Sequence, residues 1–426
     1  MYYVKIRAVI CDSPARSFVT CTKGHNGYFG CSKCIVEGDY ENHRMLFLDK
    51  DCSLRTDESF HLRKNPEYHT GISPFEKILL PMVTTFPLDY MHLVCLGQMK
   101  KLLMLWLRGS GCLECRFSGK MIKNLNFDMS ALKKYVCSEF ARVPTTVEEL
   151  DRWKATEYRI FLLYLSPVLL YKYLPNDYFK HFLAFHCAIR ILCHPTDYLQ
   201  NNQFAKNLLL YFFQYYEVLY GKENVIYTVH SLIHLSDDAN QLGPLDSFST
   251  FPFENYLHSL KKMLRKCEKP LSQIHRRIVE KNTANEYKQC KNIVKYPILV
   301  AQKKKDIFFG CSDFFESLEF RDFKLSSSSQ ANSACFLKNN KVFMIQHIGL
   351  QNGNPVIIGQ EFKNYFSFEF YPCDSRCMDV FVVNKNDLTE LKCVSTNEIL
   401  RKAVVLLYKK DKLCIFPLLH SDVTGI

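Results

Sequence analysis

Hydrophobic residues follow a different spacing in each part of the chain. Residues 3–11 are dense in β-branched and aromatic side chains and end at Asp12, which predicts a buried strand carrying an acid at its C-terminal end. Pro14 stands where proline is favoured in the first turn of a helix. On pattern alone, this region is a strand and a helix joined at a carboxylate.

Helical spacing dominates from about residue 86 to residue 235. Four segments there are apolar on most faces, which predicts helices that bury one another in a helical subdomain. They are His92–Leu107, Trp153–Tyr173, Tyr178–Cys193 and Phe204–Tyr220. The most apolar stretch, Phe161–Leu174, is shorter than a membrane span and contains Pro167 and Lys172, so we expect no transmembrane segment and no membrane partner.

A further helix is predicted at Glu254–Cys267. Leu257, Leu260 and Leu264 share one face, and a basic face available to phosphate groups lies on another. The basic residues are Lys261, Lys262, Arg265 and Lys266. A solvated polar face is the more common explanation for such a run, so the run alone does not establish DNA binding.

The last part of the chain has the spacing of short strands. Four serines at 326–329 cannot bury apolar surface, which predicts a linker or loop. Short β-prone runs then alternate with Asn, Gly and Asp turns from residue 334 to residue 419. This alternation predicts a separate small β domain.

Composition narrows these possibilities. A chain of 426 residues exceeds the size at which one core usually keeps growing, so two or three domains are expected. Lys and Arg outnumber Asp and Glu by 55 to 43, and the net charge of +12 favours a polyanionic partner such as nucleic acid. Nineteen cysteines scattered through a long chain, with no signal-peptide pattern, fit a reducing compartment better than a disulfide-rich secreted domain.

Two spaced pairs of residues predict a metal site. Cys31 and Cys34 bracket two residues of a predicted knuckle, and His230 and His234 stand four apart, on one face of a helix. Two thiolates and two imidazoles make a tetrahedral zinc site, so we expect structural Zn²⁺. The plainer alternative is an incidental Cys-x-x-Cys and two ordinary, partly buried histidines.

Several carboxylates have both a catalytic and a structural interpretation. Asp12 could cap the following helix, and Glu254 could be a first-turn acid stabilised by the helix dipole. Asp89 and His92 could be an N-cap with a core histidine, a pair of metal ligands, or a group that orients a ligand imidazole. Glu157 is the rival of Glu254, although its apolar surroundings favour packing.

Several motifs occur in an order that resembles the CACTA (En/Spm) superfamily of DDE transposases, in particular the animal transposase-domain proteins. The likeness runs from about residue 3 to residue 280 and rests on the order of the motifs rather than on any one of them. The segments are Cys11-Asp-Ser-Pro-Ala-Arg16, Lys23-Gly-His-Asn-Gly-Tyr-Phe-Gly-Cys-Ser-Lys-Cys34, Phe86-Pro-Leu-Asp-Tyr-Met-His92, Trp153-Lys-Ala-Thr-Glu-Tyr-Arg159, Val229-His-Ser-Leu-Ile-His234 and Gly243-Pro-Leu-Asp-Ser-Phe-Ser-Thr-Phe-Pro-Phe-Glu-Asn-Tyr256.

The resemblance implies an α/β chain with an incomplete RNase H-like (DDE) core, a large all-α insertion and, beyond it, the small C-terminal β domain. The corresponding regions are residues 1–85 (partial core with zinc knuckle), 86–240 (helical insertion), 241–325 (return helices of the core and linker) and 326–426 (β domain). Such transposases hold two divalent metals on three carboxylates. By motif, Asp12 corresponds to the second acid and Glu254 to the third, whereas the first acid has no counterpart.

The missing first acid decides the functional expectation. We expect an N-terminally truncated, transposase-derived protein that is catalytically defective or domesticated and that binds DNA in the nucleus. The alternative is an active cut-and-paste transposase with catalytic Mg²⁺, if an upstream exon supplies the first acid. Whether the chain forms a homo-oligomer is left open.

Overall fold

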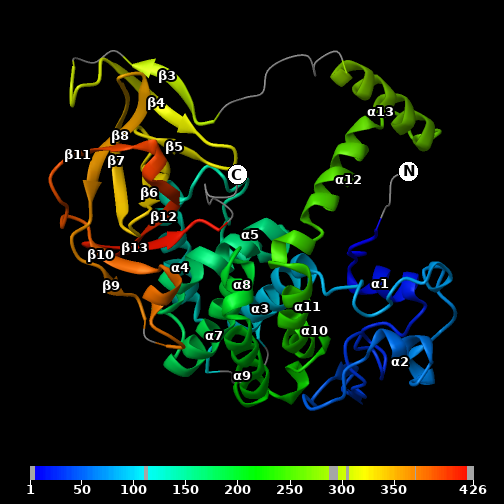
Figure 1. Cartoon of the computed structure of the whole chain (residues 1–426). Helices are drawn as coiled ribbons and strands as arrows, with labels where there is room; N and C mark the ends of the chain where they lie inside the picture. The colour runs from blue at the N-terminus through cyan, green and yellow to red at the C-terminus, as the bar shows by residue number, and fades with distance from the viewer. Residues whose placement is uncertain (1–4, 110–113, 287–295, 304–306, 370, 420–426) are drawn as a thin grey trace.

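The computed structural model describes residues 5–109, 114–286, 296–303, 307–369 and 371–419. Figure 1 shows a helical unit with an N-terminal segment on one side and a C-terminal sheet on the other. The fold is therefore mixed α/β, with a helical region followed by an antiparallel sheet. Within the described ranges, no helix combines the length and the hydrophobicity that a bilayer crossing requires.

The helical unit contains helices at all four segments that the hydrophobic spacing predicts. Two of its segments, Met91–Met99 and Phe161–Leu165, are π-helical and continue directly into α-helices. The α-helices are α3 (Lys100–Arg108), α4 (Gly119–Leu132), α5 (Ala155–Ile160), α6 (Ser166–Leu170), α7 (Asn176–Cys193), α8 (Asp197–Gln200), α9 (Asn202–Tyr220), α10 (Tyr227–Ser231) and α11 (Leu235–Leu242).

Helix α7 is buried on nearly every face. Two of its buried polar residues are histidines that donate to backbone carbonyls, His181 through Nε2 to Phe212 (2.8 Å) and His186 through Nδ1 to Leu162 (2.7 Å). Burial lowers the pKa of His181 to about 4 and that of His186 to about 3. Both imidazoles are therefore neutral members of the core.

The N-terminal segment has little regular structure. It contains α1 (Ser13–Thr20), α2 (Asp57–His61) and a two-stranded hairpin of β1 (Asp39–Glu41) and β2 (Arg44–Leu46). The predicted strand is wrong for Lys5–Cys11, which has no regular secondary structure, and residues 3 and 4 lie outside the described residues. No strand pairs with it among the described residues, and the amide of Val9 donates to the carbonyl of Thr85 (2.8 Å) instead.

Helices α12 (Phe251–Met263) and α13 (Pro270–Glu286) follow the helical unit. Figure 1 shows them extending away from the rest of the molecule. Helix α12 begins before the predicted start and ends before Cys267, and none of its residues is buried. Its predicted apolar face is only partly covered, since Leu260 and Leu264 are half-buried and Leu257 is 54% exposed.

The C-terminal sheet is antiparallel throughout, and eleven strands contribute to it. Its main path runs β11-β8-β7-β6-β12-β13-β10-β9, and β4 joins β3 and β5 to β7. The strands are β3 (Ile298–Lys303), β4 (Asp313–Glu319), β5 (Lys324–Ser326), β6 (Ala334–Leu337), β7 (Val342–Gln351), β8 (Asn354–Glu361), β9 (Phe366–Ser367), β10 (Phe381–Asn384), β11 (Lys392–Ser395), β12 (Ile399–Lys409) and β13 (Lys412–Pro417).

The serine run lies at the end of β5 and in the loop that follows it, so the predicted loop is confirmed, but it lies within the sheet domain rather than in a linker that precedes it. Ser326 is buried at the end of β5, and its hydroxyl donates to the carbonyl of Glu316 (3.2 Å). The Ser328 hydroxyl donates to the carboxylate of the same glutamate (2.6 Å). Only Ser326 lies in the strand, Ser327–Ser329 form the loop after it, and Glu316 satisfies the hydroxyls of Ser326 and Ser328.

The sheet also shares its core with the helical unit. Phe416 of β13 packs against Tyr164, and Arg190 of α7 donates to the carbonyls of Leu163 (2.8 Å) and Pro417 (3.4 Å). Lys402 of β12 is fully buried and paired with the carboxylate of Glu139 (2.6 Å). These contacts cross the boundary that the sequence pattern places between two separate domains.

Candidate metal centre

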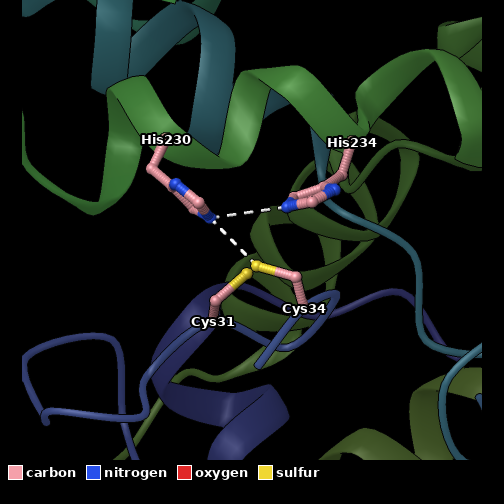
Figure 2. Close-up of side chains that lie close together, drawn as sticks. All are labelled: Cys31, Cys34, His230 and His234. Carbon is pink, nitrogen blue, oxygen red and sulfur yellow. Dashed lines mark hydrogen bonds between the residues drawn. The ribbon is translucent and has the colours of Figure 1, made fainter. Parts of the chain in front are cut away.

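Cys31, Cys34, His230 and His234 meet in the interior of the molecule, although about two hundred residues separate the two pairs. All four are buried, and their ligand atoms all lie within 4.8 Å of one another. Figure 2 shows the two imidazoles facing the two sulfur atoms across a small gap. Among the described residues, no other group of three or more His, Cys, Asp or Glu donors comes this close.

The spacing of the donor atoms fits a tetrahedral ion. Nε2 of His230 lies 3.2 Å from Sγ of Cys34 and 3.4 Å from Nε2 of His234. With bonds of about 2.3 Å to sulfur and about 2.0 Å to nitrogen, the ligands of a tetrahedral zinc lie roughly 3.3 to 3.8 Å apart. The donor set and its geometry therefore suit a four-coordinate metal with no open position.

The electrostatics of the two thiols favour a cation. Burial raises the pKa of the Cys31 thiol, but hydrogen bonding to Cys34 and the nearby imidazoles together bring that pKa well below its usual value. Hydrogen bonding to Cys31 and burial both raise the pKa of Cys34. One thiolate thus forms readily in a buried place, where a divalent cation would compensate its charge and also release the second proton.

Local structure explains how the histidines are presented. His230 lies in α10, and His234 ends the next helical turn, Leu232–His234. Spacing of four residues places both rings on one side of this helical stretch. The Nδ1 atom of His230 is buried without a hydrogen-bond partner, so Nε2 is its only atom in contact with the cluster.

A buried ion pair attaches the cysteine knuckle to the helical unit. The ammonium of Lys33, between the two cysteines, donates to Asp238 of α11 (2.5 Å) and to the carbonyl of Val83 (3.3 Å). The other carboxylate oxygen of Asp238 accepts from the amide of Leu88 (2.8 Å). Sequence reasoning missed this pair, although Asp238 follows His234 by one helical turn and Lys33 lies inside the Cys-x-x-Cys motif.

The two predicted catalytic acids both occupy helix starts. Asp12 caps α1, and its Oδ1 accepts from the amide of Ala15 (2.7 Å). Glu254 lies in the first turn of α12, with a side chain that is 55% exposed. Both structural interpretations are thus realised, and neither carboxylate belongs to a three-donor group in the described part of the chain.

His92 connects these acids electrostatically. Its Nδ1 lies 2.5 Å from Oδ2 of Asp89, and its Nε2 lies 3.6 Å from Oε1 of Glu254. The hydrogen bond to Asp89 is the main cause of the raised pKa of His92, and the charges of Asp12 and Glu254 add to it. Asp12 and Glu254 therefore each lie within electrostatic reach of His92.

Asp89 is the candidate for a third carboxylate beside Asp12 and Glu254, but both of its oxygens already accept hydrogen bonds. Oδ2 accepts from the amide of His92 (2.9 Å) and from the hydroxyl of Thr250 (2.6 Å), and Oδ1 accepts from the amide of Thr250 (2.8 Å). Burial alone would raise the pKa of Asp89, yet the hydrogen bonds from His92 and Thr250 lower it. Thr250, just before α12, was missed by sequence reasoning.

The remaining candidate site residues, Glu157 and the basic residues of the α12 region, differ in burial. Glu157 is buried and caps the start of α5 by accepting from the amide of Lys154 (2.8 Å), so it lies in a structural position. The basic residues of the α12 region are exposed, and their side chains make no hydrogen bond or ion pair with the described residues. They are Lys261, Lys262, Arg265 and Lys266.

Comparison with known proteins adds one partial match. A family model described as "Domain of unknown function (DUF8592)" matches residues 301–418. No curated protein and no solved structure matches the chain. The matched residues run from the end of β3 to β13, so the similarity concerns the C-terminal sheet and includes neither the Cys/His cluster nor the acids.

Proposed function

We propose that this protein derives from a CACTA-type DDE transposase, has lost or lacks the complete catalytic site, and binds DNA through the basic surface of α12. One observation carries the proposal: motif segments that are distant in sequence converge in space. Cys31 and Cys34 meet His230 and His234, and Asp12 and Glu254 both lie within electrostatic reach of His92. The same order of motifs is what resembles the transposases.

The ion at the Cys/His cluster is, in this proposal, structural zinc. Two sulfur and two imidazole donors favour Zn²⁺ over Mg²⁺ or Ca²⁺, which prefer oxygen. Four protein donors leave no position for a substrate or an activated water. The ion would fix the N-terminal segment on the helical unit and so hold Asp12 on the side of His92 and Glu254.

The nucleic-acid part of the proposal rests on the exposed charge of the α12 region. Lys261, Lys262, Arg265 and Lys266 have no acidic partner among the described residues, so phosphate groups can replace only water and counterions there. Arg276 and Arg277 of α13 are partly neutralised, because each pairs with Glu280. We therefore assign the main phosphate contacts to α12 and the residues just after it.

Salt-dependent DNA binding tests this assignment. Fluorescence anisotropy of a labelled duplex should give an affinity that falls with salt concentration. A double Lys261→Gln, Lys262→Gln variant should lower the slope of log K against log salt by about 2, since each lost phosphate contact removes about 0.9. Lys120→Gln with Lys123→Gln on exposed positions of α4 is the matched control.

An active transposase is the second candidate, favoured by the approach of Asp12 and Glu254 to one histidine. Two carboxylates hold a metal pair poorly, and Asp89 would have to give up its hydrogen bonds to become the third. We therefore expect no magnesium-dependent nicking of supercoiled DNA by the purified chain. Nicking that disappears in Asp12→Ala would favour the second candidate, whereas DNA binding without nicking favours the first.

A further inference from the structure

A basic pocket lies between the β1–β2 hairpin and the start of α3. Its cavity volume is about 590 Å³, and the turn at Glu223 and Asn224 closes one side. Arg44, Lys100, Lys101 and Arg108 all line it, against the single carboxylate of Glu223. A concave site with this charge balance favours an anionic ligand.

The cationic side chains of the pocket differ in whether other protein groups already pair with them. Arg108 is paired with Asp151 (2.6 Å), and one guanidinium nitrogen of Arg44 donates to the carbonyl of Glu223 (3.2 Å). Lys101, by contrast, makes no hydrogen bond or ion pair with the described residues, although it is only partly exposed. Burial, together with the charge of Arg44, lowers the pKa of Lys101 to about 8. An anion at this place would relieve the repulsion between the two cations.

The rest of the lining suits the organic part of a ligand. Leu96, Met104 and Leu105 form an apolar wall next to the cationic side chains. Binding sites for molecules of nucleotide size commonly have volumes of roughly 300 to 1,000 Å³ and combine such apolar surface with a few polar groups. Guanidinium and ammonium groups together recognise phosphate, because both supply charged hydrogen-bond donors.

We propose that this pocket binds a nucleotide phosphate, with the phosphate between Arg44 and Lys101 and the base against Met104 and Leu105. The nucleotide is either free or the phosphorylated end of a nucleic-acid strand. The inference stands apart from the DNA surface of α12, because it uses none of the residues assigned there.

The pocket and the Cys/His cluster are built on the same two chain segments. Immediately beside the pocket, Leu46 forms an isolated bridge with Ile226, and the amide of Phe47 donates to the carbonyl of Val225 (2.9 Å). The first segment continues back to Cys34, and the second continues forward to His230. Occupancy of the pocket should therefore stabilise the same junction that the metal stabilises, and the two effects can be measured separately.

Calorimetric titration of the full chain tests the proposal. The probes are ATP, inorganic phosphate, and a short oligonucleotide with and without a 5′-phosphate. We expect ATP or the phosphorylated oligonucleotide to bind, and Lys101→Met and Arg44→Gln each to weaken that binding roughly ten- to hundredfold. Lys120→Gln on α4 should leave it unchanged. Preference for ATP or for the phosphorylated strand identifies the source of the nucleotide.

The pH dependence gives a second readout. Lys101 lines the pocket together with Arg44 of the hairpin, Lys100 and Arg108 of its own helix and Glu223 of the closing turn, and its own pKa is about 8. Affinity should therefore fall as the pH rises above about 8, and Lys101→Met should lose this dependence. Lys101→Met should fold normally, because it removes a partly buried charge without a partner. Absence of binding by any of the phosphorylated probes, or unchanged affinity in folded Lys101→Met, would overturn the proposal.

Discussion

Two pairs of buried histidines in this molecule have opposite surroundings. His181 and His186 of α7 each donate to a backbone carbonyl, and each is neutral because burial lowers its pKa. His230 and His234 instead place their Nε2 atoms 3.4 Å apart, and Nε2 of His230 lies 3.2 Å from the sulfur of Cys34. Burial of a histidine is thus not sufficient to predict that it binds a metal. A candidate metal site is indicated instead by several donor atoms that converge on one point.

Removing one member of the converging set should have the largest effect. Cys34→Ser or His230→Ala should abolish most of the bound zinc and lower the free energy of unfolding by about 4 kcal/mol or more, because loss of a closed metal site also removes folding energy. Zinc content by atomic emission and chemical denaturation measure the two effects.

A neighbouring cysteine provides the matched control for that experiment. Cys52 packs beside the cluster, but its thiol donates to Asp49 (3.2 Å) and is not one of the four converging donors. Cys52→Ser should keep one zinc per chain. If Cys34→Ser retained zinc and stability, or if the purified protein held no metal and lost nothing on chelation, the cluster would be an ordinary packed core.

The second pair should respond to acid rather than to metal. The pKa of His186 is about 3 in the folded chain and about 6.5 when unfolded, so the unfolded chain binds more protons between these values. The stability that neutral His186 contributes is therefore lost as the pH falls below 6.5. The loss should reach about 2 kcal/mol near pH 5.

His186→Gln is the variant that isolates this effect. Its amide can still donate to the carbonyl of Leu162, but it does not titrate in this range. Urea denaturation at neutral pH and near pH 5 should show a smaller acid destabilisation than in the natural chain, with zinc content unchanged. An equal loss of stability in both proteins would mean that other groups control acid unfolding.

The sequence could predict the four donors of the Cys/His cluster, but it could not predict the surroundings that distinguish them from other buried residues. A spacing of three residues between the cysteines and four between the histidines specifies local geometry, and that geometry survives folding. The partners of Asp89 could not be predicted, because Thr250 reaches it across the tertiary fold. The strand expected in the segment is absent at Lys5–Cys11 for a related reason, since a β-prone apolar segment forms a strand only where another strand pairs with it.

His92 is an intermediate case between the two pairs and should show the smallest effect. It is partly exposed, and the hydrogen bond to Asp89 raises its pKa above the ordinary 6.5. A raised pKa in the folded chain means that its stabilising contribution is complete below 6.5 and is lost as the pH rises through the folded value. Asp89→Asn should bring the pKa of His92 down, as measured by its NMR titration.

Glu254→Gln tests which of two acidic neighbours, Asp89 or Glu254, has the larger effect on the pKa of His92. Asp89 contacts Nδ1 at 2.5 Å, whereas Glu254 lies 3.6 Å from Nε2 and is more exposed, so water screens its charge. Glu254→Gln should therefore lower the pKa of His92 less than Asp89→Asn does. An equal or larger effect of Glu254→Gln would mean that His92 belongs functionally with the acids of α1 and α12 rather than with the buried anchor at Asp89. It would then be a third kind of histidine, one whose protonation is controlled by the exposed acid of α12 rather than by a buried partner.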